Sequence, residues 1–356
     1  MTIIISKDGK KAQKVSKSSF EQEDYLQRYI YDNPESIPLY DIKEDIRLLI
    51  LAREFPTNSG PIDAIGIDEG GDIYLIETKL YKNPDKRLVV AQVLDYGASM
   101  WNGRNFGEFV DSLESAVQEK HKVTLNQRLK DYFGITDDDT LQVLENMKRK
   151  LEDGNFKFVV LMDKLDPRLK DLIFFINRNS QFSIFAVELE YYRYENYEII
   201  IPKIYGAETK KSGDVKTSGM RRTWDEHTFF ADANDRLTAE QLQAVQRLYD
   251  FSKETSDEIG WGGGSEKGTF NPKFYNICPR SLFTVKSSGS LILNFHWIND
   301  NEEMEKLRDK FKENLSKIKG ISISPDYKDK FIRISKTAWT PVVGEFIGVI
   351  QDLIKK

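Results

Sequence analysis

The chain has 356 residues, a length that predicts two to three domains with ample material for a buried core. Its one cysteine, Cys278, excludes an intrachain disulfide framework, and the absence of Cys or His at ligand spacing around it excludes a zinc finger. The 52 basic and 57 acidic residues give a net charge of −5, so bulk charge does not indicate nucleic-acid binding. Any such function must therefore rest on a local site.

The apolar start Ile3-Ile4-Ile5 is too short for the core of a signal peptide, and no run approaches 18 apolar residues. We therefore expect neither secretion nor contact with a membrane. A lone cysteine fits a reducing compartment, so we expect a cytoplasmic protein.

Residues 1–19 are rich in Lys and Ser and carry no hydrophobic periodicity, which predicts a flexible arm. Apolar residues at helical spacing then predict a helix from Phe20, which ends at Asn33-Pro34 because the residue before proline avoids the helical region. Three strands should follow, the last two joined as a hairpin around Glu69-Gly70-Gly71. Their expected ranges are 47–55, 62–68 and 72–80.

The rest of the first half alternates helices and strands. Asn83-Pro84 supplies an N-cap and a first-turn proline for a helix that runs to Trp101. The order helix, three strands, helix, strand favours an α/β (α+β) domain built on one mixed sheet over residues 20–206. Its further expected elements are helices at 141–151 and 167–177 and strands at 156–162, 182–194 and 197–205.

Residues 207–222 contain Lys, Ser, Gly and Thr with almost no apolar content, so they predict a flexible linker. A second α+β domain of unknown role should occupy residues 223–356. Thr238 and Gln241 form a capping box that starts one of its helices. Its other expected elements are a hairpin of 281–286 with 290–298, a helix over 307–318, strands near 321 and at 331–335, and a terminal helix at 342–354.

The hairpin sets the register of the most informative residues. If the loop is Glu69-Gly70-Gly71, the residue numbers of each cross-strand pair add to 140, and Asp63 lies directly opposite Glu77. Their Cβ atoms would be about 5 Å apart. Because side chains alternate along a strand, Lys79 shares the face of Glu77 while the Thr78 side chain points the other way.

Two carboxylates facing each other among apolar neighbours destabilise a sheet unless something compensates their charge. Mg²⁺ or Mn²⁺ would do so, with Asp63, Glu77 and the Thr78 carbonyl as ligands. Lys79 on the same face would then orient a metal-bound water and stabilise charge developing on a phosphate. This combination predicts metal-assisted phosphodiester hydrolysis.

Neighbouring helices add further candidates. Gln92 and Tyr96 are four residues apart and share a helix face, from which they would reach the site or cap a neighbouring loop instead. The preceding helix offers Glu23 as another acidic ligand, with Glu21 as the alternative. Phosphate-binding candidates cluster at the start of the helix that carries Gln92, where free backbone N–H groups also favour anions. They are Lys82, Lys86 and Arg87.

Asp63, then Glu77-x-Lys79, then Gln92-x-x-x-Tyr96 resembles the PD-(D/E)XK nuclease superfamily, in particular its branch with a Gln-x-x-x-Tyr helix. The resemblance covers the first half of the chain and implies a restriction-endonuclease-like αβββαβ core. It implies that Asp63, Glu77 and a first-helix glutamate bind Mg²⁺ and that Lys79 is the catalytic cation, with Gln92 and Tyr96 orienting the water or the lysine. Ile62 separates Pro61 from Asp63, which departs from the literal motif.

The sequence therefore predicts a metal-dependent nuclease, a hydrolase whose expected substrate is DNA, with RNA left open as the other candidate. Endonuclease and exonuclease action both stay open, and cutting both strands at once would require a homodimer. The alternative is a nuclease-fold nucleic-acid-binding or adaptor protein without turnover. A third reading is an inhibited enzyme that awaits a signal at the second domain.

Overall fold

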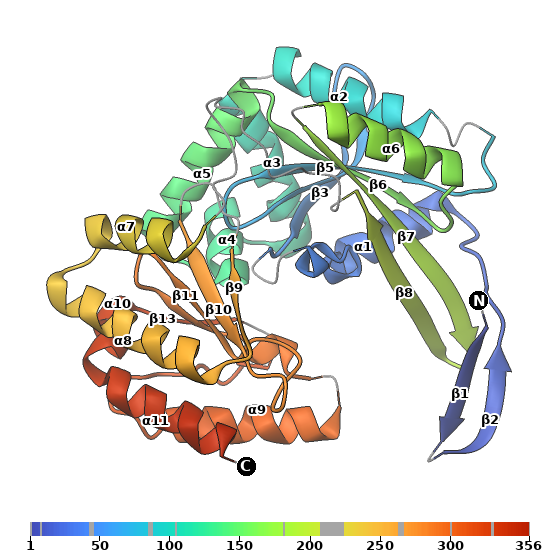
Figure 1. Cartoon of the computed structure of the whole chain (residues 1–356). Helices are drawn as coiled ribbons and strands as arrows, with labels where there is room; N and C mark the ends of the chain where they lie inside the picture. Colours follow the sequence, from blue (N-terminus) through green and yellow to red (C-terminus); the bar gives the residue numbers. More distant parts are fainter. Residues whose placement is uncertain are drawn as a thin grey trace. The chain divides into compact units, whose positions relative to one another are not determined.

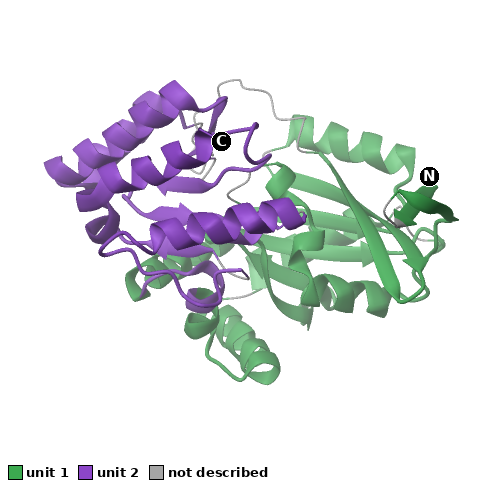
Figure 2. Cartoon of the chain, turned by 90° about the horizontal axis from the view of Figure 1, so that it is seen from below, with its two compact units in different colours: residues 1–129, 137–214 green, residues 130–136, 215–356 purple. Residues whose placement is uncertain are grey.

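The computed structural model describes residues 2–7, 9–42, 46–84, 88–103, 105–180, 182–206, 224–262, 267–299, 301–328 and 331–355. The chain divides into two compact units, which Figure 2 colours separately. Unit 1 comprises residues 1–129 and 137–214, and unit 2 comprises residues 130–136 and 215–356. The boundary at 214 falls inside the expected linker, whose residues lie outside the described part of the chain. The segment 130–136 was expected in the first domain.

Unit 1 is built on a six-stranded mixed sheet with the order β3-β4-β5-β6-β7-β8 (Figure 1). Strands β3 to β5 are antiparallel, β5, β6 and β7 are parallel, and β7 and β8 are antiparallel. The mixed α and β composition confirms the predicted fold class. The strands are β3 (Leu49–Phe55), β4 (Ile62–Ile67), β5 (Ile73–Lys79), β6 (Phe156–Met162), β7 (Ser183–Tyr194) and β8 (Tyr197–Tyr205).

Helices cover the two faces of this sheet. The side chains that each helix contacts show which face it covers. Helix α1 (Glu23–Asp32) buries Leu26 and Ile30 in one core cluster with Ile76 of β5. Helix α2 (Val89–Gly103) lies on the other face, where a Cβ at Gly97 would be 2.7 Å from the Phe158 ring of β6. Residues 77 and 79 alternate with Ile76, so they point to the α2 face.

The connection from β5 to β6 contains more helices than the sequence predicts. Besides α2 it contains α3 (Phe106–His121), α4 (Leu125–Phe133) and α5 (Asp137–Glu152), of which only α5 was expected, as 141–151. Asn105 caps α3 by accepting a hydrogen bond from the Glu108 N–H, a local signal that the sequence did contain. Helix α6 (Pro167–Asn179) then joins β6 to β7 as predicted.

The expected flexible arm is a structured hairpin. Strands β1 (Ile3–Lys7) and β2 (Lys10–Val15) pair antiparallel, so the prediction of an unstructured residue 1–19 segment was wrong. The pairing is anchored to the sheet because Val15 is buried, Lys17 bridges to Tyr192 of β7, and the Ser18 N–H donates to the Tyr191 carbonyl at 2.8 Å.

Unit 2 contains a five-stranded antiparallel sheet with the order β13-β12-β11-β10-β9 (Figure 1). The capping box of Thr238 and Gln241 at α8 (Ala239–Thr255) is confirmed. The expected strand near Ile321 is absent from the described residues, and 295–297 form a 3-10 helix instead of continuing a strand. The remaining elements are α7 (Glu226–Arg236), β9 (Glu258–Trp261), β10 (Thr269–Lys273), β11 (Phe283–Lys286), β12 (Leu291–Leu293), α9 (Glu302–Leu315), β13 (Ile332–Ile334), α10 (Lys336–Trp339) and α11 (Val343–Ile354).

No helix within the described ranges is both long and apolar enough to span a lipid bilayer.

Candidate active site

The register of the β4–β5 hairpin is the one that the loop length predicts. Ala64 pairs with Ile76, and three further pairs follow toward the turn in the same register. The ladder ends at the pair of Ala64 with Ile76, and the same register continued by one residue would place Asp63 opposite Glu77 at the open end of the hairpin. Both side chains belong to the sheet face covered by α2.

Glu77 is a buried carboxylate whose charge is only partly offset, by the nearby charge of Lys79. Glu77 is only 1% exposed, and its Oε2 atom has no hydrogen-bond partner among the described residues. Burial and then the charge of Asp63 raise the pKa of Glu77 to about 9. An orphaned buried carboxylate oxygen costs free energy, so this position is unfavourable unless a proton or a cation occupies it.

Asp63 is held by Thr78, which lies near the end of the neighbouring strand β5. Its Oδ2 accepts hydrogen bonds from the Thr78 N–H and from the Thr78 hydroxyl, each at 2.7 Å. Burial raises the pKa of Asp63, and these two bonds oppose that effect. The expectation that the Thr78 side chain points away from Asp63 was wrong, because its hydroxyl donates to the same carboxylate oxygen as its N–H.

Lys79 is oriented by the first helix. Its Nζ lies 3.9 Å from Oε2 of Glu23, whose other oxygen accepts from the Leu80 N–H at 2.9 Å and from the Asn83 side chain. Of the two candidates on this segment, Glu23 thus reaches the strand end. The Glu21 backbone carbonyl accepts from Lys82 at 2.5 Å.

Gln92 and Tyr96 form a pair on α2. The Gln92 amide donates to the Tyr96 hydroxyl at 2.8 Å, and Tyr96 is only 3% exposed. Burial, with smaller contributions from the charges of Glu77 and Asp63, raises the pKa of Tyr96 to about 12, although the hydrogen bond from Gln92 opposes the shift. The charges of Glu77 and Asp63 therefore act on Tyr96, a buried residue of α2.

Sequence reasoning missed one acidic residue of this site. In the β3–β4 ladder Arg53 pairs with Ala64 and Phe55 with Ile62, so Glu54 lies opposite Asp63. The charge of Glu54 contributes to the raised pKa values of Asp63, Glu77 and Tyr96. Glu54 also adopts a φ of 46°, which is strained for a residue with a side chain. Three strands therefore carry one row of acids: Glu54, Asp63 and Glu77.

Among the phosphate-binding candidates, Lys82 is exposed directly after the end of β5. Lys86 and Arg87 lie outside the described residues, so a phosphate-binding role stays a prediction for both of them.

The oxygen atoms around Asp63 and Glu77 are the candidate ligands for a divalent cation. No group of three Asp, Glu, His or Cys side chains within the described ranges has the geometry of a metal site. Mg²⁺, however, is commonly held by one or two carboxylates and keeps several waters. Asp63, Glu77 with its orphaned oxygen and the Thr78 carbonyl fit that simpler shell.

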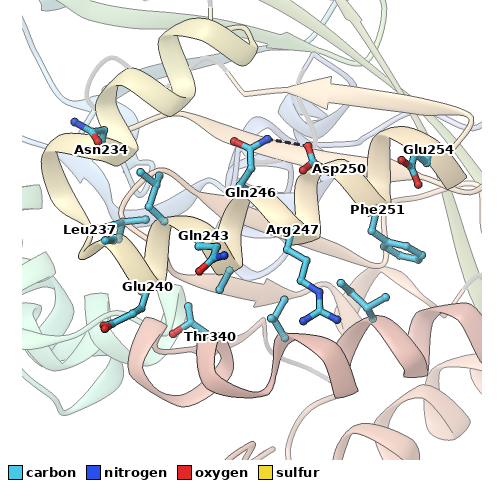
Figure 3. Close-up of a pocket in the computed structure, with 15 residues that line it drawn as sticks. Asn234, Leu237, Glu240, Gln243, Gln246, Arg247, Asp250, Phe251, Glu254 and Thr340 are labelled. Atoms are coloured by element: carbon cyan, nitrogen blue, oxygen red, sulfur yellow. Dashed lines mark hydrogen bonds between the residues drawn. The ribbon is translucent and has the colours of Figure 1, made fainter.

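Unit 2 contains a groove of about 1060 Å³ between α8 and the α10–α11 segment (Figure 3). Its lining includes three carboxylates, Glu240, Asp250 and Glu254, and a single cation, Arg247, which approaches Gly344 of α11. None of the predicted site residues lines it. The net negative charge of this groove disfavours a polyanion, so nucleic acid is not expected there.

No protein family matches the chain, and neither the curated proteins nor the solved structures contain a significant match.

Proposed function

We propose that unit 1 is a metal-dependent nuclease of the PD-(D/E)XK superfamily, with a restriction-endonuclease-like core, that hydrolyses phosphodiester bonds in DNA. The observation that carries the proposal is the buried, unpartnered Oε2 of Glu77 next to Asp63 in the hairpin register, with Lys79 two residues further along β5. This is the arrangement in which a hard cation would offset the cost of two adjacent carboxylates.

Each residue then has a role set by its contacts. Asp63, Glu77 and the Thr78 carbonyl would hold Mg²⁺ or Mn²⁺, and Thr78 fixes the orientation of Asp63. When bound, the cation supplies an acidified water and neutralises phosphate charge. Lys79 stabilises negative charge on the phosphate under attack, and Glu23 keeps its ammonium at the strand end.

The rival function is a nucleic-acid-binding adaptor with a vestigial site. A vestigial site would neutralise its buried acid internally, with Lys79 paired to Asp63. Lys79 pairs instead with Glu23, and Asp63 is bound by Thr78. Among the described contacts Lys79 forms no ion pair with Asp63, which favours turnover over a vestigial site.

The direct test is cleavage of supercoiled plasmid, linear duplex, single-stranded DNA, flapped DNA and RNA with Mg²⁺ or Mn²⁺. We expect the parent protein to cut DNA, and Lys79→Ala or chelator to abolish cutting. Lys306→Ala on unit 2, whose ammonium pairs with Glu302 at the surface, is the matched control and should cut normally. Intact substrates throughout, with DNA still bound, would establish the adaptor.

Metal binding can be measured without turnover. A ligand that binds only the folded state raises its stability, by about 2.7 kcal/mol at a hundredfold excess over Kd. We expect Mn²⁺ to raise the melting temperature of the parent and of Lys79→Ala but not of Asp63→Ala. An equal shift for Asp63→Ala would remove Asp63 from the ligand set.

A further inference from the structure

The β1–β2 hairpin, here called the lysine ribbon (residues 3–15), exposes lysines for which no ion pair is found among its described side chains. Lys10, Lys11 and Lys14 are exposed, and no described carboxylate pairs with any of them. Residues 2–19 contain five lysines and one aspartate in a chain whose net charge is −5. This local excess of positive charge runs against the composition of the whole molecule.

The ribbon has little role in the core. Within β2 only Val15 is buried, and Ile4 of β1 is 64% exposed. A two-stranded hairpin is at most marginally stable in water by itself, so its anchor at β7 is what holds it. A projecting pair of strands with an exposed cationic surface is therefore suited to contact a partner.

A chain of hydrogen bonds connects the base of the ribbon to the residues that follow Lys79. Lys17 donates to the Asp163 carbonyl at 3.4 Å, and the Asp163 side chain accepts from the Tyr81 N–H at 2.7 Å. Tyr81 follows Lys79 by two residues, or about 7 Å of extended chain. Two more lysines flank this path: Lys164 lies 4.5 Å from the centre of the Tyr81 ring, and Lys82 is the next residue.

We propose that the lysine ribbon binds duplex DNA, with Lys10, Lys11 and Lys14 contacting backbone phosphates of the same duplex whose scissile bond is presented to Lys79. Lys17, Lys164 and Lys82 add positive charge between the base of the ribbon and the end of β5, and positive charge complements a phosphate backbone. A two-stranded ribbon also fits the major groove of B-form DNA, whereas the major groove of A-form RNA is too narrow. The assignment of DNA as ligand rests on the proposed function.

Each phosphate contact contributes about 0.9 to the slope of log affinity against log salt. We would measure binding of a fluorescent 30-base-pair DNA duplex by the full chain over a salt series. The Lys79→Ala background prevents turnover. Replacing Lys10, Lys11 and Lys14 together by Gln should reduce the slope by about 2.7. The matched control replaces three exposed lysines of unit 2, Lys306, Lys317 and Lys319, and should leave the slope unchanged.

Equal slopes for the two triple variants would overturn the proposal, as would a slope change seen only with duplex RNA. Weaker binding to anionic phospholipid vesicles, with DNA binding unchanged, would assign the ribbon to a membrane instead. The outcome is separable from catalysis. If the parent protein cleaves DNA but the ribbon variant has an unaltered salt slope, the proposed nuclease function holds and the ribbon proposal fails. If the slope falls but the parent protein does not cleave, the ribbon proposal holds and the nuclease function fails. Thermal melting verifies that each variant is folded.

Discussion

At the scale of single residues, Glu77 links the site to the stability of the fold. Its pKa is raised from the 4.5 of a free glutamate to about 9, first by burial and then by Asp63. Between these two values the unfolded chain releases the proton and the folded protein keeps it. Rising pH therefore favours unfolding across this window, by up to about 1.4 kcal/mol per pH unit.

Replacing Glu77 by Gln should remove that dependence. In chelator, we expect the free energy of unfolding of the parent to fall from pH 5 to pH 9, and that of Glu77→Gln to fall much less. Denaturant titrations at pH 5, 7 and 9 measure the difference. Glu345→Gln, an exposed change on α11, should follow the parent. The interpretation of Glu77 fails if both variants show the parental pH dependence.

How far the sequence predicted the site is clearest in this row of acids. The pair Asp63 and Glu77 was predictable because a short turn fixes the register of a hairpin locally. Glu54 was not, because the β3–β4 register shifts between Ile50 and Ala52. Without that bulge, continuation of the register would place Arg53 opposite Asp63. A bulge that depends on packing decides which charge enters the site.

At the scale of elements, the close approach of α2 to the sheet positions Gln92 and Tyr96. The approach depends on Gly97, where an added Cβ would lie 2.7 Å from two atoms of the Phe158 ring. We expect Gly97→Ala to lower the free energy of unfolding by about 1–3 kcal/mol through overpacking. Denaturant titration measures this cost. We also expect weaker cleavage, because the helix must shift away from the carboxylates.

The matched control is Gly348→Ala in α11, since nothing lies within 4 Å of its added Cβ. A helical glycine there should gain up to about 1 kcal/mol on replacement by alanine. The same glycine-to-alanine substitution should thus lower the free energy of unfolding at position 97 and raise it at position 348. A neutral or stabilising Gly97→Ala would show that α2 has room to move.

The strands of unit 1 were largely predictable, and its helices less so. Strand β6 is apolar except for Lys157, and its range 156–162 matches the prediction. Helices α3 and α4 were missed, although α3 buries Phe109, Leu113 and Val117 at helical spacing. The N-terminal hairpin was also missed, because its pairing depends on an anchor at Tyr191 and Tyr192, almost 180 residues away along the chain.

At the scale of the whole molecule, the chain passes between its two units three times, at 129/130, 136/137 and 214/215. Residues 130–136 belong to unit 2, although both of their flanking segments belong to unit 1. Gly134 lies there in a left-handed conformation that ends α4, close to the Phe331 carbonyl. The units are therefore joined by more than the expected linker.

A cut within residues 207–222 should consequently not separate the two pieces. We expect a chain with an engineered protease site there to elute as one species after cleavage under native conditions, and as two in denaturant. The Phe133→Ala exchange, which removes a ring that is 1% exposed, should loosen the association. Separate native peaks for the cleaved parent protein would contradict this arrangement.

The same segment also sets an order of events during synthesis. Residues 130–136 leave the ribosome about 200 residues before Phe331, an interval of about 10 to 40 s at ordinary translation rates. Unit 1 can complete its sheet in that time, while this heptapeptide waits for residues not yet made. Closing so long a loop is slow, so the last step in refolding should be the capture of this early segment by the late half of the chain.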